Sequence, residues 1–362
     1  LNTLLQEDRK RYFAEQQAFW TAEIPVIPLF NRVNTFAARA DLEGFNPVPG
    51  EEYYTYNINE WSIPGGDTLV LGFTQEPATL FGVVETAYVM HEILMMMGAE
   101  RSYTTLNYEF QPLHMTEIPT LETGRSENVA VEVNAGDKVI DAAGEVVELA
   151  AGMMVKNSDG EEVEFTGDPV MMNQLTVNYE FRDDLKWPDG EPLKAADLEL
   201  GWMIKCDKES GATSFITCDH TASTAFEGTT FTRTAWPGDQ DPLYFSLPDY
   251  YPFPAHRVLA DGRTLADVPA AEWATLPEIA EQPWGFGPYH LTEWVKGEKM
   301  VFETHPFYYG GTPTTPNAVV AFVTPENAEA QLLGGQVDTL GSETLVGVTE
   351  ALDAAEKEGK LN

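Results

Sequence analysis

Few side chains in this 362-residue sequence have the types and spacing that an active site requires. His91 and Glu92 match the first two residues of a zinc-binding H-E-x-x-H helix, but Met95 occupies the position of the second histidine. The six histidines are scattered singly, and Asp239-x-Asp241 is too sparse for a calcium loop. No Gly-x-Ser-x-Gly and no phosphate-binding Gly-Lys-Ser/Thr occurs. The sequence therefore predicts no cofactor, no metal and no enzymatic activity.

Acidic residues dominate the composition. The 58 Asp and Glu against 21 Lys and Arg give a formal charge of -37. Two of these carboxylates could form an acid/base pair by chance, but nothing in the sequence singles out two. So large a negative charge disfavours nucleic-acid binding, and its self-repulsion suits an exported or salt-adapted protein. The sequence contains no run of about eighteen apolar residues, so it predicts no transmembrane helix.

A strand, a tight turn and a helix follow one another in the stretch that must position any site. Apolar residues alternate with polar ones over 175–181, which predicts a strand with one buried face. The segment 186–190 has the proline and glycine of a tight turn, and Trp187 can anchor that turn to a core. Apolar spacing over 195–204 predicts a helix.

This stretch resembles the signature of the large extracytoplasmic solute-binding proteins of the oligopeptide, dipeptide and nickel type, which deliver ligands to ABC importers. The family shows a strand ending in Leu-Arg, then Trp-x-Asp-Gly-x-Pro-Leu-Thr-Ala-x-Asp. The matching residues are Trp187, Asp189, Gly190, Pro192, Leu193, Ala195 and Asp197. Lys194 departs from the pattern, because lysine cannot accept the hydrogen bond of a helix N-cap.

Further segments resemble the family in the family's own order. They are Gly-x-Gly-Pro-Tyr at 285–289, an aromatic segment at 305–310 and a helix end at 328–338. The Gly-x-Gly is not a nucleotide loop, because the third glycine is missing and Pro288 has no amide to face a phosphate. The resemblance implies an α/β fold of the two-lobed periplasmic-binding-protein type, large peptide-binding class.

Residues 1–62 resemble the family in an unexpected place. A predicted helix over 5–20, a proline-broken apolar run at 24–30 and extended pieces over 37–61 are how these proteins normally end. Residues 65–74 then resemble the beginning of a mature chain. Three explanations stay open: a cut from a tandem of two binding domains, a circular permutation, or a window of a longer or fused reading frame.

The resemblance divides the chain into three parts. Residues 1–62 are a C-terminal-type tail expected to pack on lobe I, 66–285 are lobe I, mostly present, and 286–362 are the crossover and the start of an incomplete lobe II. We expect one sheet to join the strand at 69–73 to the strand at 175–181.

Residues 125–174 replace a much shorter connection in the family and predict a β-rich insertion. Turn signals such as Asn157-Ser158-Asp159-Gly160 separate short apolar runs and predict two or three hairpin strands. In an exported protein, Cys206 and Cys218 could close a small loop by a disulfide, and two unpaired thiols are the alternative.

The resemblance implies an extracytoplasmic solute-binding component that captures a peptide or similar small solute between two lobes. Its partners would be that solute and an ABC transporter permease, and it would meet the membrane only through a lipid anchor or the permease. It would work in the periplasm or on the outer face of the cell membrane. The alternatives are a cell-surface binding or scaffold domain without a transport role and a secreted hydrolase, which two close carboxylates in a pocket would favour.

Eleven residues are predicted to bind the ligand, from the loop after the first strand, the crossover, and the segment after the 328–338 helix end. They are Phe73, Thr74, Gln75, Glu76, Pro77, Trp284, Phe286, Tyr289, Ser342, Glu343 and Thr344. For the aromatic residues the competing explanation is packing, and Glu76 could be a solvated turn carboxylate. In the oligopeptide branch, the carboxylate that holds a peptide amine lies in a late segment with no counterpart here.

Overall fold

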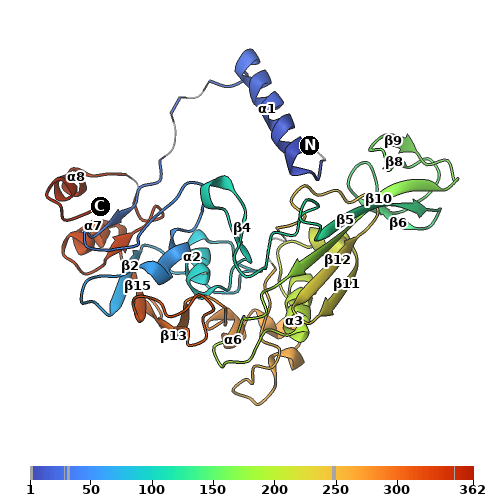
Figure 1. Ribbon diagram of the computed structural model, residues 1–362. Coiled ribbons are helices and arrows are strands. Elements are labelled where there is room, and N and C mark those ends of the chain that lie inside the picture. Colours follow the sequence, from blue (N-terminus) through green and yellow to red (C-terminus); the bar gives the residue numbers. More distant parts are fainter. Residues whose placement is uncertain (1–2, 28, 31–32, 247–249, 346) are drawn as a thin grey trace. The chain divides into compact units, whose positions relative to one another are not determined.

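The computed structural model describes residues 3–27, 29–30, 33–246, 250–345 and 347–362. The chain forms two compact units, each built around its own β-sheet (Figure 1). The first unit comprises Leu1–Asn31, Met115–Phe181 and Ser214–Pro248, and the second comprises Arg32–His114, Arg182–Thr213 and Asp249–Asn362. The predicted α/β class is confirmed, whereas the assignment of 1–62, 66–285 and 286–362 to a tail and two lobes stays a prediction.

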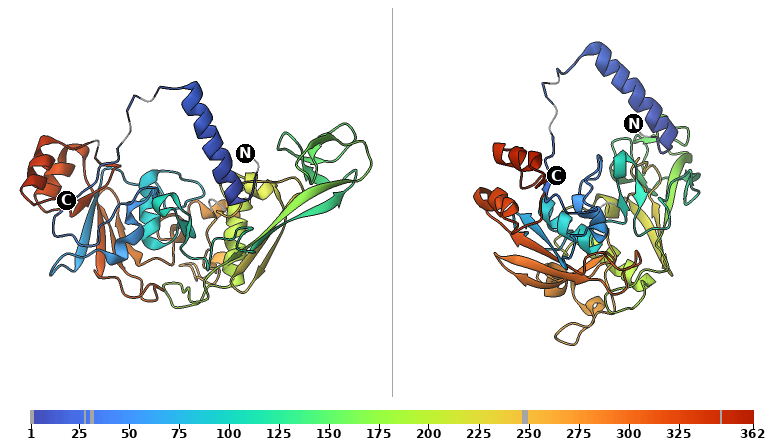
Figure 2. Two further views of the ribbon diagram at one scale, coloured as in Figure 1. Left: turned by 45° about the horizontal axis from the view of Figure 1, so that its top comes forward. Right: turned by 60° about the vertical axis from the view of Figure 1, so that its left-hand side comes forward.

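A six-stranded sheet with the order β1-β16-β2-β15-β14-β13 is the centre of the second unit. Its strands are β1 (Ala37–Ala38), β2 (Thr68–Phe73), β13 (Tyr289–Val295), β14 (Lys299–Thr304), β15 (Asn317–Phe322) and β16 (Thr339–Leu340). β2 pairs in parallel with β15 on one side and with β16 on the other, and the other pairs are antiparallel. Strands from the blue and the red ends of the chain therefore lie side by side (Figures 1 and 2).

β2 is buried because it runs through the middle of this sheet. Leu69, Leu71 and Phe73 are each at most 1% exposed. A parallel strand that is covered on both faces has a nearly continuous apolar sequence, and Thr-Leu-Val-Leu-Gly-Phe fits that pattern.

The remaining elements of the second unit are short. They are η1 (Tyr54–Glu60), α2 (Tyr88–Met97), β3 (Tyr103–Thr104), η2 (Leu106–Tyr108), β4 (Gln111–Pro112), α3 (Ala195–Cys206), η3 (Leu265–Asp267), α5 (Ala270–Trp273), α6 (Pro277–Ala280), α7 (Pro325–Leu333) and α8 (Glu350–Lys357). Among the described residues, no helix combines the length and the apolar character that a membrane span needs.

Cys206 and Cys218 are both disulfide-bonded. Of the two alternatives left open for them, a disulfide and two unpaired thiols, the structure shows the disulfide.

The predicted sheet joining residues 69–73 to residues 175–181 is wrong. The latter strand belongs to β10 (Val170–Glu180) in the first unit, within a four-stranded sheet of order β11-β12-β10-β5. A strand has only two hydrogen-bonding edges. Those of β2 are taken by β15 and β16, and those of β10 by β5 (Ser126–Val133) and β12 (Thr230–Ala235).

The insertion is β-rich and forms hairpins, as predicted, but with four short strands instead of two or three. Between β5 and β10 lie two short hairpins, β6 (Lys138–Ile140) with β7 (Val146–Glu148) and β8 (Met154–Lys156) with β9 (Glu162–Glu164). They enclose a small core of their own, made of Val133, Val139, Leu149, Val155, Phe165 and Met172. The first unit is completed by α4 (Ile216–Asp219) and β11 (Thr221–Glu227).

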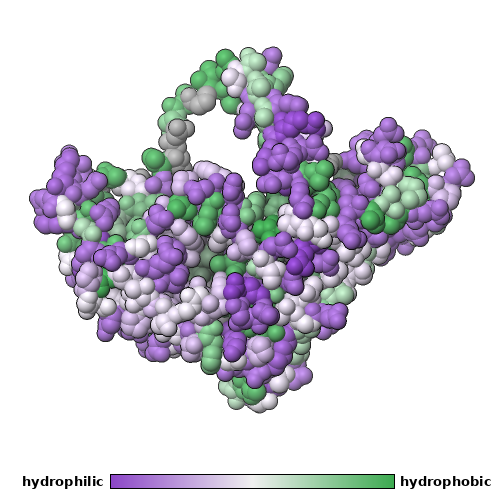
Figure 3. Space-filling view, viewed as in Figure 1, coloured by the Kyte–Doolittle hydropathy of each residue, from purple (hydrophilic) through white to green (hydrophobic). Residues whose placement is uncertain are grey.

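The predicted first helix is present as α1 (Gln6–Glu23), but it buries none of its residues. Phe13, Phe19 and Trp20 are 51%, 61% and 49% exposed, and apolar side chains gather toward its carboxyl end (Figure 3). Residues 37–62 differ from α1, since β1 joins the six-stranded sheet and Trp61 is fully buried.

A buried carboxylate, Asp197, holds the turn of the signature motif in the second unit. Its Oδ2 accepts hydrogen bonds from the Trp187 indole at 3.0 Å and from the Lys194 amide at 2.9 Å, and its Oδ1 accepts one from the Ala255 amide at 2.8 Å. Trp187 is fully buried, as predicted. Lys194 occupies the N-cap position of α3, and its side chain accepts no hydrogen bond there. Asp197 reaches back to the Lys194 amide and so satisfies one of the amides at the start of the helix.

The Gly-x-Gly of residues 285–287 lets two backbones approach closely. The Phe286 amide donates to the Gly98 carbonyl at 3.2 Å, and the Gly287 amide donates to the Met97 carbonyl at 2.8 Å. A Cβ at Gly285 would lie 2.1 Å from the Met97 oxygen. These glycines therefore serve backbone packing against the end of α2.

Replacing Asp197 by asparagine should lower the free energy of unfolding by about 2–4 kcal/mol, because an amide cannot accept from all three buried donors. Urea unfolding followed by circular dichroism measures this change. Glu199→Gln, on an exposed position of the same helix, is the control and should be neutral. Equal stability of Asp197→Asn and wild type would show that Asp197 does not hold the turn.

Replacing Gly287 by alanine should cost about 3 kcal/mol, because the new Cβ would lie 2.3 Å from the Gly98 nitrogen and a backbone must move. Gly347→Ala is the matched control, since its Cβ would meet nothing within 4 Å. The two variants are compared by thermal unfolding. A Gly287→Ala variant as stable as Gly347→Ala would contradict the packing role.

Candidate functional site

Three parallel strands of the second unit end at one edge of its sheet. β2, β15 and β16 finish at Phe73, Phe322 and Leu340. Phe73 itself and the loops that follow β2 and β16 account for eight of the eleven predicted site residues. In open α/β sheets, ligands bind beyond the carboxyl ends of the strands. This edge is therefore where the second unit offers a site.

The loop after β2 is partly open and partly engaged. Phe73 and Pro77 are buried and Thr74 is half-buried, whereas Gln75 is exposed. Glu76 is exposed too, but its Oε1 accepts from the Trp294 indole at 2.7 Å and its Oε2 accepts from the Gly297 amide at 2.9 Å. Glu76 thus ties this loop to the β13–β14 turn.

The crossover aromatics mainly pack. Phe286 is 1% exposed and lies 4.2 Å from the ring of Trp187. Tyr289 is fully buried and donates its hydroxyl hydrogen to the Thr315 carbonyl at 2.7 Å. Trp284 is only half-buried, and the Arg257 guanidinium lies 4.3 Å from its ring centroid.

The loop after β16 contacts β2. The Thr344 hydroxyl lies 3.4 Å from the Gly72 carbonyl oxygen and 3.2 Å from Oε1 of Glu343. Ser342, Glu343 and Thr344 are all half-buried. The structure therefore brings Ser342–Thr344 to the same edge as the loop after β2.

A buried carboxylate that was not among the predicted site residues lies near this loop. Glu92 of α2 is fully buried, and its Oε2 accepts the Thr55 hydroxyl at 2.9 Å. Its two oxygens also face the amides of Tyr54 and Thr55 at 3.4 Å. The signal for it was present, because Glu92 is the one carboxylate in the largely apolar helix Tyr-Val-Met-His-Glu-Ile-Leu-Met-Met-Met.

Glu92 and Glu343 influence each other. Burial raises the pKa of Glu92 well above its usual range, and the charge of Glu343 raises it further. Burial also raises the pKa of Glu343 to about 7, against a usual value of 4.5. Among the residues that the structure describes, no lysine or arginine is a main influence on either pKa.

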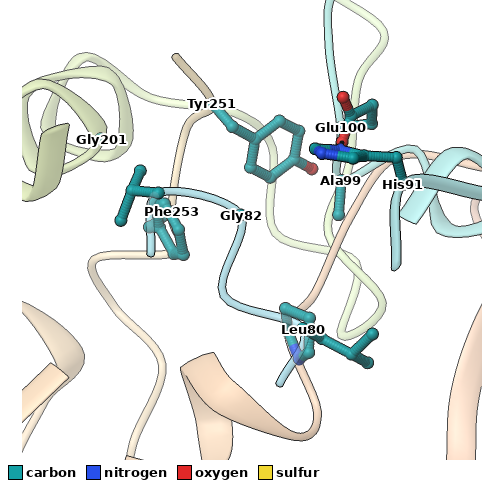
Figure 4. Close-up of a pocket in the computed structure, with 10 residues that line it drawn as sticks. Leu80, Gly82, His91, Ala99, Glu100, Gly201, Tyr251 and Phe253 are labelled. Carbon is teal, nitrogen blue, oxygen red and sulfur yellow. Dashed lines mark hydrogen bonds and ion pairs between the residues drawn. The ribbon is translucent and has the colours of Figure 1, made fainter. Parts of the chain in front are cut away.

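A small pocket lies elsewhere in the second unit (Figure 4). Its volume is about 40 Å³, and its lining includes Leu80, Tyr251, Phe253 and the pair His91 and Glu100, whose Nδ1 and Oε2 are 2.7 Å apart. That volume holds water but not a peptide. Within the described ranges, no three His, Cys, Asp or Glu side chains are grouped to hold a metal ion.

Comparison with known proteins identifies relatives. The family described as "Bacterial extracellular solute-binding proteins, family 5 Middle" matches residues 170–360, a range that excludes most of the insertion. Protein XP55 of Streptomyces lividans is 28% identical over 165 residues, which cover 45% of this chain and 28% of XP55. A probable ABC transporter-binding protein of Deinococcus radiodurans is 23% identical over 203 residues, which cover 51% of this chain and 34% of that protein.

One solved structure supports the fold. The oligopeptide binding protein of Thermus thermophilus complexed with pentapeptide aligns with a TM-score of 0.51 and 18% identity, over 75% of this chain and 44% of that chain. At this identity the similarity concerns the fold. The chain spans less than half the length of the relatives that it matches.

Glu343→Gln should change the pH dependence of stability. Because the folded protein holds the Glu343 proton up to a pKa of about 7, this group's contribution to stability is present below its ordinary pKa of 4.5. That contribution is lost as the pH rises to about 7, which lowers the free energy of unfolding by about 3 kcal/mol. Urea unfolding between about pH 4.5 and pH 7.5 should show a smaller loss in Glu343→Gln than in wild type.

Glu356→Gln, at an exposed position of α8, is the control and should follow the wild-type profile. Identical profiles of wild type and Glu343→Gln would contradict the assigned environment of Glu343.

Proposed function

Because the chain belongs to the bacterial extracellular solute-binding proteins of family 5, we propose that it captures a peptide or a similar small solute and delivers it to an ABC transporter permease. The family places solute binding outside the cytoplasm, and we extend that location to this protein. Contact with a membrane is then through the permease or a lipid anchor. Since the chain spans less than half of its relatives, capture is proposed for the complete protein to which these residues contribute.

The observation that carries this proposal is the convergence of loops at the carboxyl ends of β2 and β16. An extended peptide offers a main chain with regularly spaced donors and acceptors, and loops at a sheet edge can pair with it. Gln75 is exposed beside β2, and the Ser342–Thr344 loop contacts β2 through the Gly72 carbonyl. These loops supply both polar side chains and backbone groups.

The eleven predicted site residues take three roles in this proposal. Direct contacts with the solute come from Thr74, Gln75, Ser342, Glu343 and Thr344. Glu76 ties the loop after β2 to the β13–β14 turn, and Phe73 and Pro77 are buried at the base of that loop. Trp284, Phe286 and Tyr289 have packing roles away from this loop, and Tyr289 lies at the opposite end of the sheet, level with the start of β2. The burial of Phe286 and Tyr289 is the reason for assigning them a packing role.

The hydrolase alternative gains little from the pair Glu92 and Glu343. A glycosidase needs both carboxyl groups at the scissile bond. Glu92 has no exposed surface and three donors from η1 face its carboxylate, so a substrate has no access to it. We therefore assign this pair to binding or stability and not to hydrolysis.

Pentaalanine provides a direct test. Calorimetric titration should show saturable binding, and Gln75→Ala should weaken it by about 1 kcal/mol, or roughly fivefold, because one hydrogen bond to the peptide is lost. Gln336→Ala is the matched control, since Gln336 is also exposed but precedes β16, at the opposite end of the strand. No binding of pentaalanine, or equal losses in both variants, would count against a peptide site at this edge.

A further inference from the structure

The insertion at residues 125–174 borders a hollow in the first unit, and the proposed function leaves this part of the chain without a role. The hollow has a volume of about 530 Å³, which lies within the range of small-molecule sites. Its walls come mainly from the segments 140–144 and 156–160 of the two hairpins, from 238–241 after β12, and from His220 at the end of α4. All of these residues belong to the first unit.

Hydrogen bonds fix these walls before any ligand binds. Oδ1 of Asp141 accepts from the amides of Ala143 and Glu145, both at 2.9 Å, and so holds the turn of the first hairpin. The Ile140 amide donates to the Pro237 carbonyl at 2.8 Å, which ties that hairpin to the loop after β12. Because the loops are already ordered, a ligand does not have to order them, and this favours affinity.

One carboxylate of the lining is already neutralised. Asp239 is 6% exposed, and its Oδ2 accepts from the buried Arg233 guanidinium at 3.0 Å. Its Oδ1 lies 3.2 Å from Nδ1 of His220. Asp239 therefore positions His220 and contributes little charge to the hollow.

Other polar groups of the lining remain for a ligand. Asp141, Asp159 and Asp241 offer carboxylate acceptors, and Lys156 offers an ammonium donor. Within the part of the chain that the structure describes, none of these four side chains forms an ion pair. Asp159 is exposed and Lys156 is half-buried, so both have accessible surface. The hollow therefore presents donors and acceptors together.

A second hollow, of about 710 Å³, adjoins the first at Gly144 and His220, which line both. Trp236 lines this second hollow together with Ile216, which is 68% exposed. Nζ of Lys138 lies 5.6 Å from the centroid of the Trp236 ring. The second hollow thus adds aromatic and aliphatic surface to the polar groups of the first.

We propose that the two hollows form one groove that binds a short neutral oligosaccharide. This site lies in the first unit and is independent of the peptide site proposed at the carboxyl ends of β2 and β16 in the second unit. A sugar ring has hydroxyl groups around its edge and C–H groups on its faces. The polar hollow matches the hydroxyl groups, and the hollow with Trp236 matches the C–H faces.

The mixture of groups in the groove selects hydroxyls over charged ligands. A hydroxyl both donates and accepts, so it can donate to Asp159 and accept from Lys156. An anionic ligand would be repelled by the aspartates, and an ammonium ligand would be repelled by Lys156 and Lys138. An indole ring gives the C–H face of a sugar a broad apolar surface. For a metal ion, no three His, Cys, Asp or Glu side chains are grouped among the described residues.

Calorimetric titration with maltotetraose, cellotetraose and tetra-N-acetylchitotetraose tests the proposal, with spermidine as a cationic and trigalacturonic acid as an anionic comparison. At least one of the three neutral oligosaccharides should bind saturably and more tightly than either charged compound. If none of the three binds, or if only spermidine or only trigalacturonic acid does, the proposal is overturned. These outcomes do not depend on whether pentaalanine binds to the second unit.

Two variants locate the binding. Asp159→Ala and Lys156→Met should each weaken binding of the oligosaccharide about tenfold, because each removes a charged hydrogen bond. Asp168→Ala is the matched control, since Asp168 is exposed in the same insertion but lines neither hollow. Asp159 is exposed, so its variant should fold as wild type does, and circular dichroism checks this. Wild-type affinity in Asp159→Ala, or an equal loss in Asp168→Ala, would contradict the site.

Discussion

The parallel pairing of β2 with both of its neighbours determines where the second unit can hold a solute. Parallel strands bring their carboxyl ends to the same edge of a sheet, so the loops after β2 and β16 meet although about 270 residues separate them in the chain. The Asp338 carboxylate stabilises the pairing of β16 with β2, since its Oδ2 accepts a hydrogen bond from the Val70 amide at 2.7 Å. The burial of Leu69, Leu71 and Phe73 holds β2 firmly in the middle of the sheet. A solute site at the end of β2 is therefore built on a rigid strand.

Several parts of this structure could be predicted because local chemistry determines them. The turn at Trp187 combines a proline, a glycine and an anchoring indole, and Gly190 has the positive φ of 91° that the turn needs. The hairpins of the insertion follow from glycines at fixed places between short apolar runs, and Gly144 and Gly160 also have positive φ. In such segments each residue type restricts the backbone by itself.

Other parts could not be predicted, because they depend on partners far away in the chain. Residues 69–73 and 175–181 both read as half-buried strands, and nothing in either one says which strand occupies its edges. The role of Glu92 also needed three dimensions, since its neighbours Thr55 and Glu343 come from two distant segments. Of the predicted site residues, Glu76 has a carboxylate that could bind a solute. Both of its oxygens instead accept hydrogen bonds from the β13–β14 turn, more than 200 residues away in the chain.

The central claim, that a solute is held at the carboxyl ends of β2 and β16, is tested most directly by hydrogen–deuterium exchange with and without pentaalanine. The account predicts that the peptide slows exchange of backbone amides in residues 74–77 and 341–345, while amides of the β6–β9 hairpins and of α8 exchange as before. Slowed exchange confined to the hairpins or α8, or no change in the two loops under saturating peptide, would contradict it.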